Sequence, residues 1–335
     1  MAKFKNLSTQ REFILVGIII MMTLGVGFRN SEFLTLNSIK DIFTDNSLLM
    51  MLVIGQMMVI ITKGIDLSIA STIAFTGMSV ALFSHAFPEF PIAGIILMAM
   101  LIGLALGSFN GLCVSLFEIP PIVVTLGTMS AYRGLTFVLA NGQWVNAHEM
   151  TQSFQGFPQV TILGLSTLIW FAIVTIIIAM IFLNHTRLGR SIYGLGGNPL
   201  AAQYVGINSK KILFLVYALN GLICGLVGYF WVARYALASS EVALGLELEV
   251  IAGCVIGGIS IAGGVGAITG ALLGALFLGV IGNALPVLNV SPFWQMAISG
   301  GVILMAVVIN SREEKQKGKI ILRKAIKTLS LGKSV

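Results

Sequence analysis

Long apolar runs recur along almost the whole chain, and their length constrains the fold more than any other feature. They extend from Phe13 nearly to the C-terminus, and each is close to the roughly 20 residues that an α-helix needs to cross about 30 Å of hydrocarbon. Only 10% of the 335 residues are charged, against roughly 25% in an ordinary soluble domain. Because lipid offers the backbone no hydrogen-bond partners, these runs predict helices. The expected fold class is an all-α polytopic membrane protein.

Polar breaks between the runs predict about ten transmembrane helices within residues 1–310, followed by a basic tail, 311–335. The eighth and ninth helices are the least distinct, because glycines rather than charged residues interrupt the run between Gly253 and Gly270. For the tail, a basic amphipathic helix on the inner leaflet and a disordered segment both stay open. The expected bounds of the ten helices are 13–28, 47–62, 69–84, 92–117, 120–140, 166–183, 212–235, 249–263, 267–283 and 294–309.

Glycine at every fourth position marks three of these helices. Small residues at this spacing let the backbones of neighbouring membrane helices approach closely, which predicts tight packing and no chemistry. The glycines are Gly103, Gly107 and Gly111, Gly221 and Gly225, and Gly266, Gly270 and Gly274.

The distribution of Lys and Arg predicts the orientation. With ten crossings and a cytoplasmic N-terminus, sixteen of these residues fall inside and only two, Arg29 and Lys40, fall in outside loops. Basic residues favour the cytoplasmic side of membrane proteins. An odd number of crossings would tend to separate the basic loop 184–211 from the basic tail, so both termini are expected in the cytoplasm.

Several classes of function lack the residues that they need. Cys113, Cys224 and Cys254 lie inside apolar runs at no metal-binding spacing, so neither a metal site nor a disulfide is expected. The spans show no nucleophile with a base, no H-E-x-x-H and no paired carboxylates, so no catalytic residue is expected. No G-x-x-x-x-G-K-[ST] occurs, so the chain is not expected to bind ATP by itself.

The stretch "GIDLSIAS", Gly64 to Ser71, places polar residues between two apolar runs. Asp66 or Ser68 would serve as the N-cap of the third helix. Alternatively, the stretch is a helix break that lines a solute path. A second glycine-rich interruption, 257–270, has a comparable position in the second half of the chain, which favours an inverted repeat of spans 2 to 5 and 7 to 10.

The basic loop 184–211 contains its own helix signal. Asn198 suits an N-cap, Pro199 suits the first helical position, and Gly206 would end the helix. A short cytoplasmic helix with exposed apolar residues suits docking into a groove of a partner protein, although it could also rest on its own domain.

These segments together resemble the inner-membrane permeases of bacterial ABC importers for monosaccharides, the ribose-type branch that includes rhamnose and autoinducer-2 permeases. The resemblance covers nearly the whole chain, and "YRGLTFVLANGQWVNAHEM" looks closest to the rhamnose and autoinducer-2 end. Two departures are Ala70 and Val265, where relatives often carry glycine and a basic residue. The segments that carry the resemblance are "GIDLS", "NG" at Asn110, "IPPIVVTLGTMSAYRGL", "TRLGRSIYGLGGNPLAAQYVGIN" and "GLELEVIAGCVIGGISIAGGVGAITGALLGALFLG".

The resemblance implies a permease without enzymatic activity or a cofactor, in the inner membrane. Its implied partners are two cytoplasmic ATPase subunits that bind ATP, a periplasmic solute-binding protein, a second copy or sister permease, and membrane lipids, but no nucleic acid. It also implies that the 198–207 helix couples the ATPases to the spans. The residues expected in this coupling are Arg190, Asn198, Pro199, Ala201, Ala202, Gly206 and Ile207.

An importer's path needs polar side chains that offer transient hydrogen bonds to a hydroxyl-rich solute. Arg133 would either pair with Asp66 or reach outward to the interface. The competing hypothesis is a secondary transporter driven by an ion gradient through a carboxylate such as Asp66. The candidates for the translocation path are Asp66, Ser68, Ser71, Asn110, Thr125, Asn220, Ser260 and Asn283.

Overall fold

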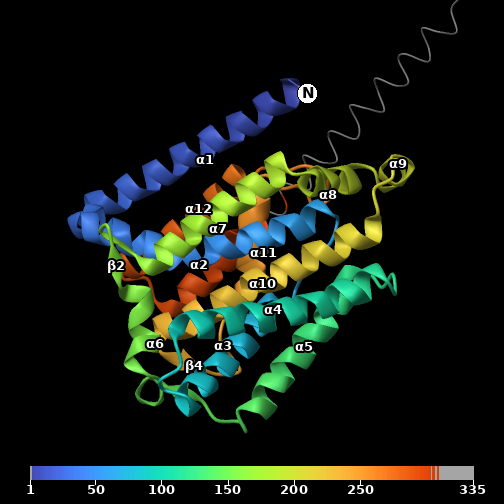
Figure 1. Ribbon diagram of the computed structural model, residues 1–335. Helices are drawn as coiled ribbons and strands as arrows, with labels where there is room; N and C mark the ends of the chain where they lie inside the picture. The colour runs from blue at the N-terminus through green and yellow to red at the C-terminus, as the bar shows by residue number, and fades with distance from the viewer. Residues whose placement is uncertain (1, 303, 306–307, 309–335) are drawn as a thin grey trace, which may run out of the picture.

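The computed structural model describes residues 2–302, 304–305 and 308, and helices make up most of it (Figure 1). The predicted tail, 311–335, lies outside the described residues. The long helices are α1 (Ala2–Arg29), α2 (Leu36–Ile61), α3 (Ile69–Ala86), α4 (Ile92–Ser115), α5 (Pro121–Leu139), α7 (Thr167–His185), α10 (Ser209–Tyr235) and α12 (Ile268–Val287).

Shorter elements connect the long helices. Strand β1 pairs with β4, and β2 pairs with β3, both in antiparallel fashion. The short helices are α6 (Gln152–Gly156), α8 (Arg187–Gly197), α9 (Pro199–Tyr204) and α11 (Leu246–Ile256), with 3-10 turns η1 (Ser31–Leu34), η2 (Ala147–Glu149) and η3 (Phe157–Gln159). The strands are β1 (Val145–Asn146), β2 (Thr161–Ile162), β3 (Leu165–Ser166) and β4 (Leu237–Ala238).

Within the described residues, eight helices are long and apolar enough to cross a membrane, namely the eight long helices above, with α1 counted from Arg11. This confirms the all-α polytopic fold class. Most of their ends fall within a few residues of the predicted bounds. The exception is α2, which begins at Leu36 rather than near residue 47. The hydroxyl of Thr35 accepts a hydrogen bond from the Ser38 amide at 3.3 Å, and this cap extends the helix through a polar stretch.

Two predicted helices differ from expectation. The eighth was expected over 249–263, but α11 ends at Ile256 after 11 residues, which span only about 16 Å. Gly258, Gly263 and Gly264 take positive φ angles of 85°, 85° and 73°, and these turn the backbone out of the helix. The tenth, expected over 294–309, is helical from 292 to 302, and its end falls among residues that the structure describes only in part.

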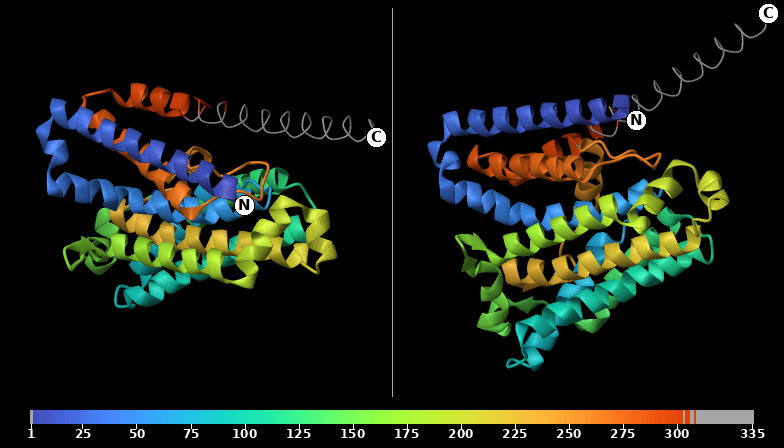
Figure 2. Two further views of the ribbon diagram at one scale, coloured as in Figure 1. Left: turned by 90° about the horizontal axis from the view of Figure 1, so that it is seen from above. Right: turned by 45° about the horizontal axis from the view of Figure 1, so that its top comes forward.

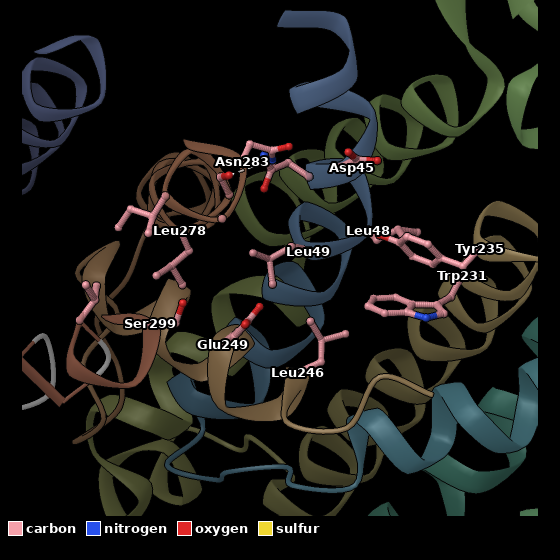
Figure 3. A pocket seen from close by; sticks show the side chains of 15 residues that line it. Asp45, Leu48, Leu49, Trp231, Tyr235, Leu246, Glu249, Leu278, Asn283 and Ser299 are labelled. Atoms are coloured by element: carbon pink, nitrogen blue, oxygen red, sulfur yellow. Dashed lines mark hydrogen bonds between the residues drawn. The ribbon is translucent and has the colours of Figure 1, made fainter. Parts of the chain in front are cut away.

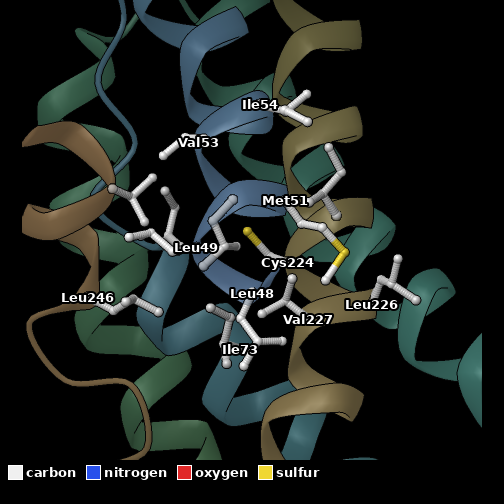
Figure 4. Close-up of a cluster of buried hydrophobic side chains, with 14 of the residues drawn as sticks. Leu48, Leu49, Met51, Val53, Ile54, Ile73, Cys224, Leu226, Val227 and Leu246 are labelled. Atoms are coloured by element: carbon white, nitrogen blue, oxygen red, sulfur yellow. The ribbon is translucent and has the colours of Figure 1, made fainter. Parts of the chain in front are cut away.

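Helices α2 and α10 form the interior of the bundle. In their most apolar windows, 94% of the α2 residues and 72% of the α10 residues are buried, against 28% for α4, α5 and α7. Figure 4 shows their shared core, where Met51 and Ile54 of α2 face Cys224 and Val227 of α10. Helix α1 instead lies along the outside of the bundle, beside α12 (Figure 2).

The regularly spaced glycines of α4 and α10 pack closely against each other, as predicted. A β-carbon on Gly103 would collide with the carbonyl oxygen of Gly221, and one on Gly221 would collide with that of Gly103. Gly107 and Gly225 make the same kind of contact between α4 and α10. Bare backbone therefore packs on bare backbone along this pair of helices, which confirms the predicted tight packing.

The connections between helices gather at two opposite faces of the bundle, and α8 and α9 lie at one end in Figure 1, away from β2, β4 and α6. We call the first end the α8 face and the second the β face. At the α8 face the Gly264 amide donates to the Ile61 carbonyl at 2.9 Å. At the β face Val145 pairs with Ala238.

The packing of the two halves is exchanged: α10 packs on α3 and α4, whereas α2 packs on α11 and α12. Such an exchange is expected of two related four-helix units, so the inverted repeat stays a prediction with support. The pairing of the two glycine-rich segments is wrong, however. Residues 64–68 and 257–267 both lie at the α8 face, joined by the bond between Ile61 and Gly264, whereas inverted counterparts would lie at opposite faces.

Candidate functional site

The break between α2 and α3 places Asp66 inside the bundle. Helix α2 ends at Ile61, and Lys63 turns the chain with a φ of 68°. Gly64 follows, packed so closely on the Tyr217 hydroxyl that a β-carbon would collide with it. The chain then runs without helix to Ser68. The carboxylate of Asp66 is buried and meets Asn220, which lies near the middle of α10, so this acid points from the α8 face into the bundle.

A hydrogen-bond network surrounds this carboxylate. Asp66 Oδ1 accepts from the Ser68 amide at 2.9 Å and from the Ser68 hydroxyl at 2.6 Å, while Oδ2 accepts from the Asn220 amide group at 2.9 Å. The Ser68 hydroxyl accepts in turn from Asn110 Nδ2 at 2.8 Å. The Tyr132 hydroxyl donates to Asn110 Oδ1 at 3.4 Å. The network therefore joins the break to α4, α5 and α10.

Two further predicted residues hold the same region. The Thr125 hydroxyl bonds with the Ile65 carbonyl at 3.1 Å, and the Ser71 hydroxyl donates to the Ser68 carbonyl at 2.8 Å. Six of the eight predicted path residues are thus brought together, and each is at most 3% exposed. We call this set the Asp66 network: Asp66, Ser68, Ser71, Asn110, Thr125 and Asn220.

The capping interpretation of the break is correct in part. Ser68 is the residue before α3, but its side chain makes no cap bond. Asp66 instead accepts from the Ser68 amide, two residues on, as turn-forming aspartates do. Its second oxygen goes to Asn220, far away in sequence. The Asp66 carboxylate therefore both accepts from the local turn and bonds to a distant helix.

The remaining predicted residues lie elsewhere. Ser260 belongs to the 257–267 connection at the α8 face, where its amide donates to the Val265 carbonyl at 3.0 Å. Asn283 lies on α12 and donates to the Gly279 carbonyl at 2.9 Å. Arg133 does not pair with Asp66: its guanidinium donates to the carbonyls of Ser240 and, at 3.0 Å, Val242, so it anchors the connection between α10 and α11.

A second polar region is a cavity of about 230 Å³ between α2, α10, α11, α12 and the helical segment 292–302 (Figure 3). Asp45, Trp231 and Glu249 line it together with Asn283. We call it the Glu249 cavity. The described residues that line it are Asp45, Asn46, Leu48, Leu49, Trp231, Tyr235, Leu246, Glu249, Leu278, Gly279, Ile281, Gly282, Asn283, Ser299 and Val302.

The groups in the Glu249 cavity are only partly engaged. Arg234 Nη2 donates to Asp45 Oδ1 at 2.8 Å, so the Asp45 charge is balanced. Within the described part of the chain, no side chain or amide donates to the Glu249 carboxylate. The rings of Trp231 and Tyr235 lie 5.1 Å apart between centroids. Sequence reasoning found only Asn283 here, although the opposite charges of Asp45 and Arg234 near span ends were a usable signal.

The basic loop 184–211 contains the predicted helix. Helix α9 runs from Pro199 to Tyr204, and the Asn198 side chain accepts from the Ala201 amide at 3.1 Å. Gly206 follows with a φ of 82°. Ala201 and Arg190 are exposed, whereas Ala202 is buried and Ile207 is half-buried, so these last two hold the loop together. The tip of α9 is apolar and exposed: Leu200 by 70%, Tyr204 by 92% and Val205 by 77%.

Helix α8 joins this loop to the spans through backbone atoms. A β-carbon on Gly196 would collide with the Ile61 carbonyl oxygen, and one on Gly264 would approach the Gly197 α-carbon to 2.5 Å. The Tyr193 hydroxyl donates to the Gly266 carbonyl at 3.1 Å. We call this contact the glycine junction. It connects α8 with the end of α2 and with the connection between α11 and α12.

Comparisons with known proteins cover most of the chain. Residues 38–307 match the family described as branched-chain amino acid transport system / permease component. The ribose import permease protein RbsC of Escherichia coli (strain K12) is 37% identical over 302 residues, 90% of this chain and 93% of that protein. The autoinducer 2 import system permease protein LsrC of Salmonella typhi is 31% identical over 308 residues, 92% of this chain and 88% of that protein. No solved structure matches the chain significantly.

Proposed function

The chain belongs to the family of the branched-chain amino acid transport permease component, and from this premise we propose that it is the membrane-spanning subunit of an ABC importer for a sugar or sugar-like solute. Two similar proteins are named as import permeases, one for ribose and one for autoinducer 2. Separate ATPase subunits would supply the energy, and a periplasmic binding protein would deliver the solute. A second permease copy, or a sister permease, would complete the pair.

The exposed tip of α9 is the observation that carries this proposal. Leu200, Tyr204 and Val205 project an apolar surface beyond the spans, and a short helix of this kind fits a groove on a partner. Its base is fixed to α2 and to the α11–α12 connection by the glycine junction. A movement of the tip is therefore transmitted to both halves of the bundle. The ATPases would bind here, which makes the α8 face cytoplasmic, as the basic residues predict.

The test is hydrolysis of ATP by the complete assembly of permease, ATPase and binding protein. We expect Tyr204→Glu and Ala201→Arg to lower solute-stimulated hydrolysis at least 10-fold, because each places a charge in the docking surface. Leu163→Asp is the matched control, because Leu163 is 88% exposed in the turn at the β face. Full stimulation in both tip variants would refute the coupling role.

The same assembly separates the proposal from an ion-driven transporter. We expect uptake to stop when the ATPase subunits are removed and to survive a protonophore in ATP-loaded vesicles. Uptake that persists without the ATPase and collapses with the protonophore would favour the ion-driven alternative. It would also give Asp66 a role as an ion-coupling carboxylate.

We further propose that the Asp66 network closes the translocation path in this conformation. Its six side chains are buried, and they bond either to one another or to the backbone of the break and of α5, so they can reach a solute only after α4, α5 and α10 move apart. Rocking of rigid helices is a known way to open such contacts. Unchanged uptake of radiolabelled solute in the double variant Asp66→Ala, Asn110→Ala would disprove this assignment.

A further inference from the structure

The Glu249 cavity brings polar and aromatic groups together around an open space. It places the carboxylates of Asp45 and Glu249, the amide of Asn283 and the indole of Trp231 around one space. In Figure 3 these side chains come from α2, α10, α11 and α12 and surround the same opening. Convergent polar groups on a partly apolar wall are the usual composition of a small-molecule site.

The bonding state of these groups favours a ligand with hydroxyl groups. Asn283 Nδ2 bonds to Gly279 of its own helix, which leaves its Oδ1 free to accept. In the part of the chain that the structure describes, nothing donates to Glu249, so its two oxygens are also free acceptors. Hydroxyl groups are donors that match carboxylate and amide oxygens. The Trp231 and Tyr235 rings add flat apolar faces against which C–H groups of a sugar ring can pack.

The charge of the cavity argues against anionic ligands. Arg234 neutralises Asp45 through a 2.8 Å ion pair, so the one uncompensated charge is that of Glu249. A negative charge at short range repels a carboxylate or a phosphate, and it does so more strongly away from bulk water. The volume of about 230 Å³ is below the roughly 300 to 1,000 Å³ of drug-sized sites, which suits one small solute.

We propose that the Glu249 cavity binds a neutral polyhydroxylated solute during transport, with Glu249 and Asn283 accepting its hydroxyl protons and Trp231 packing on its ring. The proposal rests on the function proposed above and names the solute class for it. It excludes sugar phosphates as occupants. Branched-chain amino acids, which the family description names, are the competing occupants that the test separates, because Glu249 would repel their carboxylate but attract their ammonium group.

The test is reactivity of a cysteine in the cavity, measured in proteoliposomes that contain the assembled transporter. Ser299→Cys, which lines the cavity but is not one of the proposed binding groups, is made in a chain that carries Cys113→Ala, and the reagent is a cationic, water-soluble methanethiosulfonate. Leu101→Cys on α4 is the reference for a site outside the cavity, and Leu163→Cys at the β face is the reference for an open loop. Both of these leucines are exposed on the isolated chain.

We expect Ser299→Cys to react at least 10-fold faster than Leu101→Cys, because a polar cavity of about 230 Å³ admits water and a small reagent. We expect D-ribose, D-glucose or xylitol to slow that reaction at least 3-fold without slowing Leu163→Cys, and L-leucine and ribose 5-phosphate to have no effect. Adding Trp231→Leu should abolish the protection. Gly282→Cys, at a lining position with open space around its β-carbon, repeats the measurement if Ser299→Cys does not fold.

Three outcomes would overturn the inference: a reaction no faster than that of Leu101→Cys, no protection by any of the three neutral probes, or equal protection by leucine or the phosphate. These results are separable from a failure of the proposed function. If ATP hydrolysis by the wild-type assembly responds to solute while the cavity cysteine is unprotected, only the cavity assignment is wrong.

Discussion

The Asp66 network and the Glu249 cavity are both polar regions inside an apolar protein, but they differ in how far their groups are satisfied. In the network both oxygens of the carboxylate accept hydrogen bonds, and the side chains are at most 3% exposed. In the cavity Glu249 has no donor among the described residues, and open space adjoins it. In the network Asn220 Oδ1 has no partner among the described residues, but the carboxylate itself is fully bonded. A bonded buried carboxylate resists rearrangement, whereas unpaired groups beside a space are available to a ligand. We therefore attribute a structural role to the network in this conformation, in which it closes the path, and solute contact to the cavity.

Removal of the Asp66 carboxylate should lower the stability of the protein more than any other change in the two regions. Asp66→Ala leaves the amide and hydroxyl of Ser68 and the amide group of Asn220 without their acceptor. We expect a loss of at least about 3 kcal/mol, seen as a drop of roughly 6 to 12 °C in the thermal midpoint of the purified protein in detergent. The control is Asp41→Ala, because Asp41 is exposed on α2. Equal midpoints in the two variants would contradict a structural role for the network.

Loss of the link to α4 and α5 should have an intermediate effect. Asn110→Ala removes the donor to the Ser68 hydroxyl and the acceptor for the Tyr132 hydroxyl. The Tyr132 hydroxyl keeps its 2.9 Å bond to the Leu106 carbonyl, which limits the damage. We expect a loss of about 2 kcal/mol, or roughly 4 to 8 °C in the same thermal measurement. A drop larger than that of Asp66→Ala would mean that Asn110, and not the carboxylate, is the centre of the network.

A peripheral member of the network should matter less. Ser71→Ala removes one neutral bond, the 2.8 Å contact with the Ser68 carbonyl. We expect a loss of about 1 kcal/mol, or roughly 2 to 4 °C, and no change in the oligomeric state seen by size-exclusion chromatography. A loss as great as that of Asn110→Ala would show that the local turn is as important as the links between helices.

The smallest effect on stability is expected in the cavity. Glu249→Gln removes a charge that has no donor in the described structure, and it keeps the volume of the side chain. The thermal midpoint should therefore stay within about 1 °C of the wild type. If Glu249→Gln destabilised the protein as much as Asp66→Ala does, the two regions would not differ in the way described above.

Much of the architecture follows from the sequence, because membrane-crossing length and glycine spacing are local signals. The start of α2 was missed because it depends on the cap at Thr35. The end of α11 was missed because consecutive glycines remain apolar on a hydropathy scale while they leave the helix. In both cases backbone geometry, rather than apolarity, decides where the helix begins or ends.

The two polar regions differ in how well the sequence indicates them. Residues such as Asn110 and Asn220 stand out as polar groups inside apolar runs, and such groups must find partners, so their meeting with Asp66 could be anticipated. The cavity depends on the shape left between packed helices. Glu249 and Trp231 come from separate elements, and no spacing in the sequence relates them.

The glycine junction also determines which parts of the chain can be exchanged between relatives. Because Gly196 meets Ile61 and Gly264 meets Gly197 without intervening side chains, the fit depends on backbone position and not on residue identity in the neighbouring loops. A chimera that carries the α8–α9 loop of a similar permease should keep the glycine junction when the loop has glycine at positions 196 and 197. The tip of α9 could then be changed to suit a different ATPase while the transmitting contact stays the same.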